Sequence, residues 1–253
     1  DAVVAPLSGR VHLLLSGQDL QGEQPVGAVE LSWGSEVEGA ALGRDLGCRH
    51  DLDGDGLADL LIGSPFDDLE AEAAGSVHQV ELLSGLVHEQ GRAWSGDRGE
   101  DYMGWSLSTG DMDGDGLPEL AVGAPGAAGG DGLVLLFDGE RLLQGGGSPQ
   151  VRIEGQPGER LGLRVELSDL DGDGLAELLV GAPRHEASGQ FAAGALYLFS
   201  ASSLGANRVL GSGDAPASFR REQAYLRTGQ GLALGDVDGD GVPDLGLLLE
   251  VEP

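Results

Sequence analysis

The chain has 253 residues, enough for one large all-β domain or two smaller ones. Glycine contributes 46 residues and aromatic residues only 4%, a composition that suits short strands joined by tight turns better than long helices. The net charge of −29, from 43 acidic and 14 basic residues, argues against nucleic acid and anionic membranes as partners and favours cations.

Cysteine and hydropathy patterns add little to this. Cys48 is the only cysteine, so no internal disulfide can form, and we expect its side chain to fill a small apolar position. No apolar run reaches the roughly 18 residues of a membrane span. The sequence therefore predicts no direct insertion into a membrane.

The first elements in chain order are two strands near the N-terminus. Residues 1–6 and 9–15 are similar to the second and third strands of a repeat whose loop is missing, and Asp1 is a candidate for the last residue of that loop. Residues 1–20 are therefore interpreted as a partial repeat.

The next segment contains every element of one repeat. Residues 42–46 predict a first strand, and the acidic loop DLDGDGLAD runs from Asp51 to Asp59. Residues 60–65 predict a buried second strand that is ended by Gly and Pro, and residues 75–83 predict a buried third strand.

The same elements recur along the chain. Loops in the same register begin at Asp111, Asp169 and Asp236, at spacings of 60, 58 and 67 residues. First strands are expected at 103–107, 161–165 and 229–234, second strands at 120–125, 178–183 and 245–249, and third strands at 132–137 and 194–199. Short apolar segments such as 150–154 are candidates for fourth strands. Similarity on both sides of each loop indicates a structural repeat, with copies at about 21–85, 86–140 and 141–200 and a partial copy at about 201–253.

Each loop has acids at positions 1, 3, 5 and 9 and glycine at positions 4 and 6. Calcium takes six to eight oxygen ligands, and glycine permits the backbone angles that let three carboxylates and a carbonyl at position 7 converge on one ion. The sequence therefore predicts about four calcium ions. The predicted ligands are Asp51, Asp53, Asp55, Leu57, Asp59, Asp111, Asp113, Asp115, Leu117, Glu119, Asp169, Asp171, Asp173, Leu175, Glu177, Asp236, Asp238, Asp240, Val242 and Asp244.

Other interpretations of the loops are weaker. An EF-hand needs an acid at position 12, where this chain has Ile62, Val122, Val180 and Leu247. Magnesium prefers fewer carboxylates, and a simple hairpin turn needs one Asp-Gly pair rather than four acids in register. Because the carboxylates would repel one another without an ion, we expect the calcium to be structural.

Motifs on both sides of the loops point to a known family. Leu42-Gly43, Met103-Gly104 and Leu161-Gly162 precede the loops, and Gly123-Ala124-Pro125 and Gly181-Ala182-Pro183 follow them. This pattern resembles the FG-GAP repeats of the integrin alpha-subunit head and of related bacterial surface proteins, with the Phe of the FG position replaced. The resemblance implies an all-β fold, a β-propeller of four-stranded antiparallel blades with calcium between the first and second strands of each blade.

The resemblance also implies a function. It suggests a calcium-stabilised binding, adhesion or scaffolding module that acts through protein–protein contacts. The loops between second and third strands face ligands in such proteins, which makes Phe66, Arg184, His185 and Phe191 candidate partner contacts. Extracellular calcium modules bind with Kd of order 10⁻⁴–10⁻³ M, far above cytosolic calcium, so we expect an extracellular, cell-surface or periplasmic location.

Two questions stay open. Both ends of the chain lie inside a repeat, so we expect part of a longer propeller, usually of seven blades, that assembles with further chain segments or subunits; the alternative is a closed ring of about four. No Gly-x-Ser-x-Gly motif or histidine cluster is present, so no enzyme is expected. The alternatives are a non-catalytic propeller attached to an extracellular hydrolase and a structural repeat of a surface assembly.

Overall fold

The computed structural model describes residues 9–13, 31–35, 39–67, 72–80, 82–83, 86–87, 92–96, 98–205, 208–220 and 223–248. The described part is all-β, and its helical segments are single turns: α1 (Ala127–Gly130), α2 (Gly139–Leu143), α3 (Ala201–Leu204) and the 3₁₀ turn η2 (Ser212–Asp214). Among these residues no helix has the length and apolar character needed to cross a bilayer.

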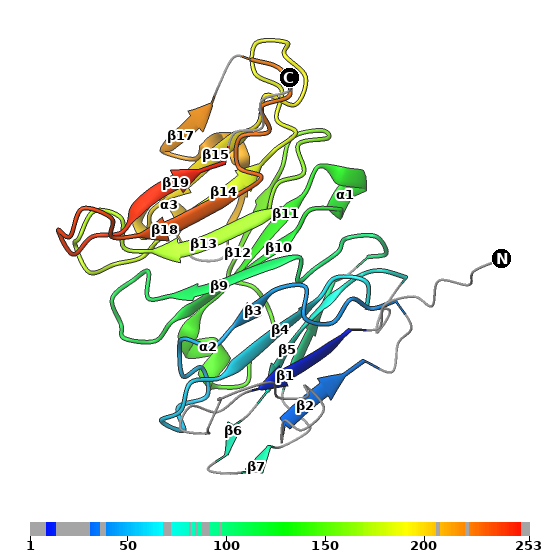
Figure 1. The fold of residues 1–253 in the computed structure, drawn as a ribbon, viewed down its shortest axis with the longest axis vertical. Coiled ribbons are helices and arrows are strands. Elements are labelled where there is room, and N and C mark those ends of the chain that lie inside the picture. The colour runs from blue at the N-terminus through cyan, green and yellow to red at the C-terminus, as the bar shows by residue number, and fades with distance from the viewer. Residues whose placement is uncertain are drawn as a thin grey trace, which may run out of the picture.

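Three sheets correspond to the three complete repeats (Figure 1). The first contains β3 (Leu46–Gly47), β4 (Leu60–Ser64), β5 (Ser76–Val80) and β8 (Ala93–Ser95). The second contains β9 (Ser106–Gly110), β10 (Glu119–Ala124), β11 (Leu133–Phe137), β12 (Val151–Glu154) and β16 (Arg208–Gly211). The third contains β13 (Arg164–Ser168), β14 (Glu177–Ala182), β15 (Ala195–Phe199) and β17 (Ala217–Arg220).

Two-stranded sheets lie before and after these three. At the N-terminal side β1 (Arg10–Leu13) pairs with β2 (Leu31–Gly34), and at the C-terminal side β18 (Leu232–Gly235) pairs with β19 (Asp244–Leu247). A short hairpin, β6 (Leu82–Leu83) with β7 (Leu86–Val87), extends from the first sheet. The expected strand at 9–15 is confirmed over the length of β1, whereas residues 1–6, including Asp1, lie outside the described residues.

The predicted second and third strands are confirmed in all three complete repeats, whereas the first strands begin three or four residues later than expected, at Leu46, Ser106 and Arg164. The repeat bounds also differ from the sheets. β8 lies in the segment expected to belong to repeat 86–140, yet it pairs with β5. β12 lies in the segment expected to belong to repeat 141–200, yet it pairs with β11. A fourth strand pairs antiparallel with the third strand that precedes it in the chain, so each sheet ends inside the next sequence repeat.

The longest loop spacing has a structural cause that the repeat pattern did not predict. Between β15 and β17 the chain makes an excursion to the second sheet, where β16 pairs parallel with β12 from Val151↔Arg208 to Glu154↔Gly211. The 67-residue spacing, against 58 and 60 elsewhere, accommodates β16 and the turn η2.

Glycines make the junction between successive sheets. A Cβ added to Gly123 of the GAP position would lie 2.0 Å from the carbonyl oxygen of Gly162, the FG glycine of the next repeat. The same contact would be 2.1 Å at Gly63 against Gly104 and 2.1 Å at Gly181. The two motifs that define the repeat are thus the two sides of one close backbone approach, which only glycine permits.

The core fills the space between the sheets. Every residue of β10 and β14 is buried, and Leu120, Leu161, Leu178 and Tyr197 have no exposed surface. The expectation for Cys48 is wrong, because this side chain is exposed. Cys48 directly follows β3, which has only two residues and carries Leu46, itself 50% exposed, so this segment lies outside the buried part of the sheet.

Candidate metal centres

The four acidic loops have the same hydrogen-bond pattern. In the first loop, the two carboxylate oxygens of Asp51 accept hydrogen bonds from the backbone N–H groups of Gly54 at 2.6 Å and Gly56 at 2.7 Å. The corresponding bonds to Asp111, Asp169 and Asp236 lie between 2.6 and 3.0 Å. Glycine is required at both donor positions because each adopts a positive φ, from 78° to 91° across the four loops.

The other acids are fixed by backbone donors as well. The carboxylate at position 3 accepts from the N–H of position 5, and the carboxylate at position 5 accepts from the N–H of position 7. The acid at position 9 accepts from the N–H of position 2, as Asp59 does from Leu52 at 2.7 Å. The loop backbone therefore orients every predicted carboxylate ligand before any ion binds.

Three carboxylates converge in each loop, with their ligand atoms within 4.8 Å of one another. In the first, third and fourth loops these are the acids at positions 1, 3 and 9. In the second loop they are Asp111, Asp113 and Asp115, at positions 1, 3 and 5. The structure thus brings together three of the four predicted acids of each loop. The carbonyl ligands expected at Leu57, Leu117, Leu175 and Val242 stay a prediction.

Glu119 explains why the second loop differs. Its two carboxylate oxygens accept hydrogen bonds from the backbone N–H groups of Met112 at 2.7 Å and Gly139 at 3.2 Å. Burial raises the pKa of Glu119 to about 7, although both hydrogen bonds oppose the shift. A side chain held by the start of α2 does not join the three converging carboxylates.

Backbone hydrogen bonds and burial have opposite effects on the pKa values of the loop acids. Burial opposes ionisation of Asp51, but the N–H groups of Gly56 and Gly54 outweigh it and lower the pKa of this carboxyl. Burial raises the pKa of Glu177, and the charges of Asp171 and Asp173 add to the effect. A bound cation would relieve this repulsion by favouring the charged forms.

The donor set fits a hard divalent cation. Each cluster offers carboxylate oxygens without histidine or cysteine. Oxygen ligands from several carboxylates suit calcium better than zinc or magnesium. When bound there, the ion would supply the positive charge that the loop lacks. His50 adjoins the first loop, and its Nδ1 lies 2.7 Å from Thr109 Oγ1.

The four candidate partner residues lie in different environments. Arg184 and Phe191 are exposed, Phe191 by 54%, and Phe66 is half-buried. His185 is only 5% exposed, so its expected role as a surface contact is wrong. Its Nδ1 lies 2.9 Å from Oε1 of the buried Glu159, which needs a partner away from solvent.

Neither polar network near the loops has the geometry of a catalytic triad. In the first repeat, Nε2 of His78 contacts both Ser76 Oγ at 2.8 Å and Asp67 Oδ2 at 3.1 Å. A triad requires the acid on one imidazole nitrogen and the hydroxyl on the other. In the third repeat, Nδ1 of His185 contacts both Glu159 Oε1 at 2.9 Å and the Tyr197 hydroxyl at 3.2 Å, so again a single imidazole nitrogen faces the acid and the hydroxyl.

The sequence reasoning missed a cavity of about 480 Å³ at the other end of the first strands. We call it the arginine pocket. Five arginines and an indole line it: Arg44, Arg160, Arg164, Arg184, Arg227 and Trp105. A signal was present in the sequence, because Arg44 directly follows an FG glycine, Arg160 precedes an FG position and Arg184 follows a GAP proline.

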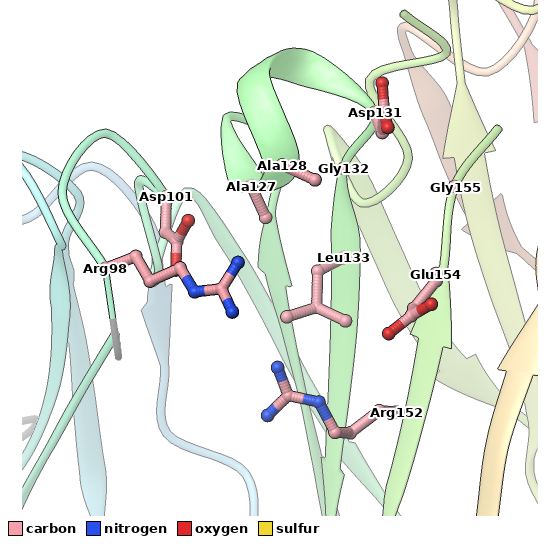
Figure 2. Close-up of a pocket in the computed structure, with 10 residues that line it drawn as sticks. All are labelled: Arg98, Asp101, Ala127, Ala128, Asp131, Gly132, Leu133, Arg152, Glu154 and Gly155. Carbon is pink, nitrogen blue, oxygen red and sulfur yellow. The ribbon is translucent and has the colours of Figure 1, made fainter. Parts of the chain in front are cut away.

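A second cavity, of about 210 Å³, shows a different charge pattern (Figure 2). The guanidinium groups of Arg98 and Arg152 point into it from opposite sides, with Leu133 between them. Asp101 and Glu154 also line it, so carboxylates accompany the two cations. This cavity has mixed charge, whereas no carboxylate from the described part of the chain lines the arginine pocket.

Comparison with known proteins agrees with the repeat pattern. The FG-GAP repeat family matches residues 51–78, 103–137 and 162–199. Integrin alpha-PS2 of Drosophila melanogaster is 31% identical over 212 residues, which is 77% of this chain and 14% of that protein. Integrin alpha-V of Gallus gallus is 30% identical over 148 residues, 58% of this chain and 14% of that protein.

A relative with a different name matches over a similar length. Phosphatidylinositol-glycan-specific phospholipase D of Bos taurus is 31% identical over 158 residues, 56% of this chain and 18% of that protein. The chain thus spans less than a fifth of the length of each of these three relatives. The residues matched by the family contain the first three acidic loops and the junction glycines Gly63, Gly104, Gly123, Gly162 and Gly181. The chain is an FG-GAP repeat protein, similar over these repeats to integrin alpha subunits.

Proposed function

We propose that this chain is a calcium-stabilised β-propeller region that binds protein partners outside the cytoplasm. The observation that carries the proposal is the fourfold repetition of one loop geometry, with three converging carboxylates and the same backbone donors in every copy. In this reading each of the three main sheets contains the four strands of one blade, to which β16 adds a fifth strand in the second sheet, and each loop joins the first two strands of its blade.

The packing of the sheets supports the propeller. The glycine contacts at Gly63, Gly123 and Gly181 repeat the same junction between neighbouring sheets. The first strands also bond to one another, since the N–H groups of Val165 and Leu167 donate to the hydroxyls of Ser106 and Ser108. Successive sheets related by one repeated contact are the arrangement of blades around an axis.

Integrin relatives support the binding role and the extracellular location. Their alpha subunits are the proteins to which the chain is similar over most of its length. We propose no catalytic activity for the chain, because neither the metal loops nor the two polar networks offer an activated nucleophile. Assembly with further chain segments or subunits is part of the proposal.

The similarity to phosphatidylinositol-glycan-specific phospholipase D favours a second candidate. In that case the chain is a non-catalytic propeller attached to an extracellular hydrolase. Both candidates share the calcium loops, and they differ in the rest of the protein that carries the repeat region. A hydrolase domain in the same polypeptide would favour the second.

Thermal unfolding with calcium and with chelator tests the metal claim. Calcium that binds the folded state raises its Tm, by the free energy RT ln(1 + [L]/Kd) at each site. The variant Asp169→Asn keeps an oxygen acceptor for one glycine N–H but removes one charge. We expect it to lower the Tm in calcium, and to raise it or leave it unchanged in chelator, where Asp171 and Glu177 are no longer repelled.

A change in Tm that is negative in calcium but zero or positive in chelator separates the loss of metal binding from a general loss of structure. A matched control is Asp214→Asn, an exposed acid of η2 that lies outside the four loops. Its effect on Tm should be the same with calcium and with chelator. Identical unfolding curves of the parent chain under both conditions would overturn the proposal.

A further inference from the structure

We propose that the arginine pocket binds carboxylate side chains of an acidic peptide segment in a protein partner. The inference rests on the proposed function in one respect, that the chain acts by binding proteins. It names the chemistry of one contact, at a site separate from the metal loops.

The first argument is the concentration of positive charge. Five of the 14 basic residues of the chain line this one cavity, in a molecule whose net charge is −29. Among the described residues, no Asp or Glu lines it. Strongly acidic chains do not gather arginines by composition alone, so the cluster marks a place where negative charge is expected from outside.

Two of the pocket arginines, Arg160 and Arg184, are not neutralised by carboxylates of the described residues. Arg164 has the weaker neighbours Asp45 at 3.8 Å and Glu166 at 3.9 Å. Burial and the nearby charges of Arg160 and Arg227 lower the pKa of the Arg184 guanidinium, which indicates that the three side chains lie close enough to repel.

The rim of the pocket favours a peptide over a simple ion. The Arg44 guanidinium stacks over Trp105 at 4.4 Å from the ring centroid. Trp105 continues into an aromatic cluster, with Phe66 at 6.0 Å and Tyr102 at 6.4 Å between centroids. Arginine, tryptophan and tyrosine are the residues that dominate binding energy in protein interfaces.

A second aromatic pair lies on the segments that carry the pocket. Phe191 and Tyr225 stack edge to face at 5.9 Å and are 54% and 46% exposed. Tyr225 lies two residues before Arg227. Only 4% of the chain is aromatic, so exposed aromatics beside the arginines add apolar surface for side chains that flank the carboxylates.

The charge of the whole chain also limits the kind of anion. Nucleic acid, sulfated glycans and anionic membranes are larger than the pocket, so they would also contact the acidic surface around it and be repelled. A short acidic segment places its charge only inside the pocket. A guanidinium group can donate two parallel hydrogen bonds to one carboxylate. One or two Asp or Glu side chains can therefore bind several of the pocket arginines.

The test is a titration followed by NMR of the arginine Nε–Hε signals, at one calcium concentration and with the folded chain. The probe is the blocked peptide acetyl-Glu-Phe-Glu-amide, and its control is acetyl-Gln-Phe-Gln-amide. We expect saturable shifts of the signals of Arg160, Arg184 and Arg227 with the first peptide alone. The signal of Arg208, an exposed arginine of β16 outside the pocket, should not move.

The double variant Arg160→Gln/Arg184→Gln should weaken binding at least tenfold, the factor expected from losing charge-assisted hydrogen bonds. Arg208→Gln should leave the affinity unchanged. If the double variant fails to fold, the residue-specific shifts of the parent chain still decide the question.

Four results would overturn the proposal: no saturable shift, equal binding of the Gln peptide, equal movement of Arg208, or displacement of the peptide by an equal concentration of inorganic sulfate. The last would mark a general anion site. Failure of calcium to raise the Tm would count against the proposed function and leave this titration interpretable, since the folded parent chain is measured at a fixed calcium concentration.

Discussion

Gly123→Ala tests the junction that defines the repeat. Gly123 has no positive φ, so alanine can adopt its backbone conformation without local strain. The new Cβ would lie 2.0 Å from the Gly162 carbonyl oxygen and 3.0 Å from its carbonyl carbon. Cβ atoms essentially never approach other heavy atoms within 3.0 Å, so one sheet must move by about 1 Å against the next.

The loss of stability in Gly123→Ala depends on which atoms must move to make room for the new Cβ. Overpacking typically costs about 1–3 kcal/mol, and this case belongs at the upper end because the obstructing atoms are backbone and cannot rotate away. We expect a loss of about 3 kcal/mol in the free energy of unfolding. For a chain of this size that corresponds to a fall in Tm of about 6–12 °C.

The matched control is Gly235→Ala. Gly235 is also a strand glycine without a positive φ, but a Cβ there would meet nothing within 4 Å. Alanine should raise the stability by a few tenths of a kcal/mol, because it reduces the entropy of the unfolded chain. The assay is thermal unfolding in saturating calcium, with circular dichroism as the readout. Equal Tm values for the two variants would refute the close approach of the GAP and FG backbones.

Three further predictions concern single side chains. Glu159→Gln should destabilise the fold at pH 7. Burial alone would raise the pKa of Glu159, but the hydrogen bonds from His185 and Tyr197 outweigh burial and lower this pKa below its ordinary value of 4.5. A carboxyl with a lowered folded-state pKa stabilises above its unfolded-state pKa, so the difference in denaturation midpoint between Gln and Glu should shrink as pH falls below about 4.5. Thr228→Val should raise the Tm by about 2–4 °C, roughly 1 kcal/mol, because the buried Thr228 Oγ1 has no hydrogen-bond partner in the described structure; an unchanged or lower Tm would contradict this. Glu119→Gln should reduce the calcium-dependent gain in Tm less than Asp111→Asn does, since Glu119 lies outside the converging carboxylates. Paired scans with and without calcium measure this gain, and an equal or larger reduction in Glu119→Gln would show that Glu119 is a ligand.

The metal loops could be predicted from the sequence because their geometry is local. All acids of a loop lie within nine residues, and the glycines at positions 4 and 6 provide the donors that orient the first aspartate. Glu119 departs from the pattern because one of its donors, Gly139, lies 20 residues away. A contact of that range depends on how α2 docks, which no loop motif records.

Non-local pairing explains the other differences. β16 joins the sheet of the preceding repeat through a parallel pairing, and nothing in the segment 208–211 indicates its partner. The sequence predicts that His185 is an exposed loop residue, but its contact with the buried Glu159 places its side chain in the interior. The arginine pocket draws residues from four successive repeats, so it exists only once the glycine junctions have set the sheets side by side.

The placement of charge allows an acidic chain to bind an acidic peptide. Each first strand begins near the arginine pocket and ends at a metal loop, as β13 does between Arg164 and Asp169. Five residues of strand span about 17 Å, roughly twice the Debye length of about 8 Å at physiological salt. The loop carboxylates are therefore largely screened from the pocket, and calcium would reduce their charge further. The net charge of −29 describes the molecule as a whole, whereas the sign that a ligand meets is set within one screening length of Arg160 and Arg184.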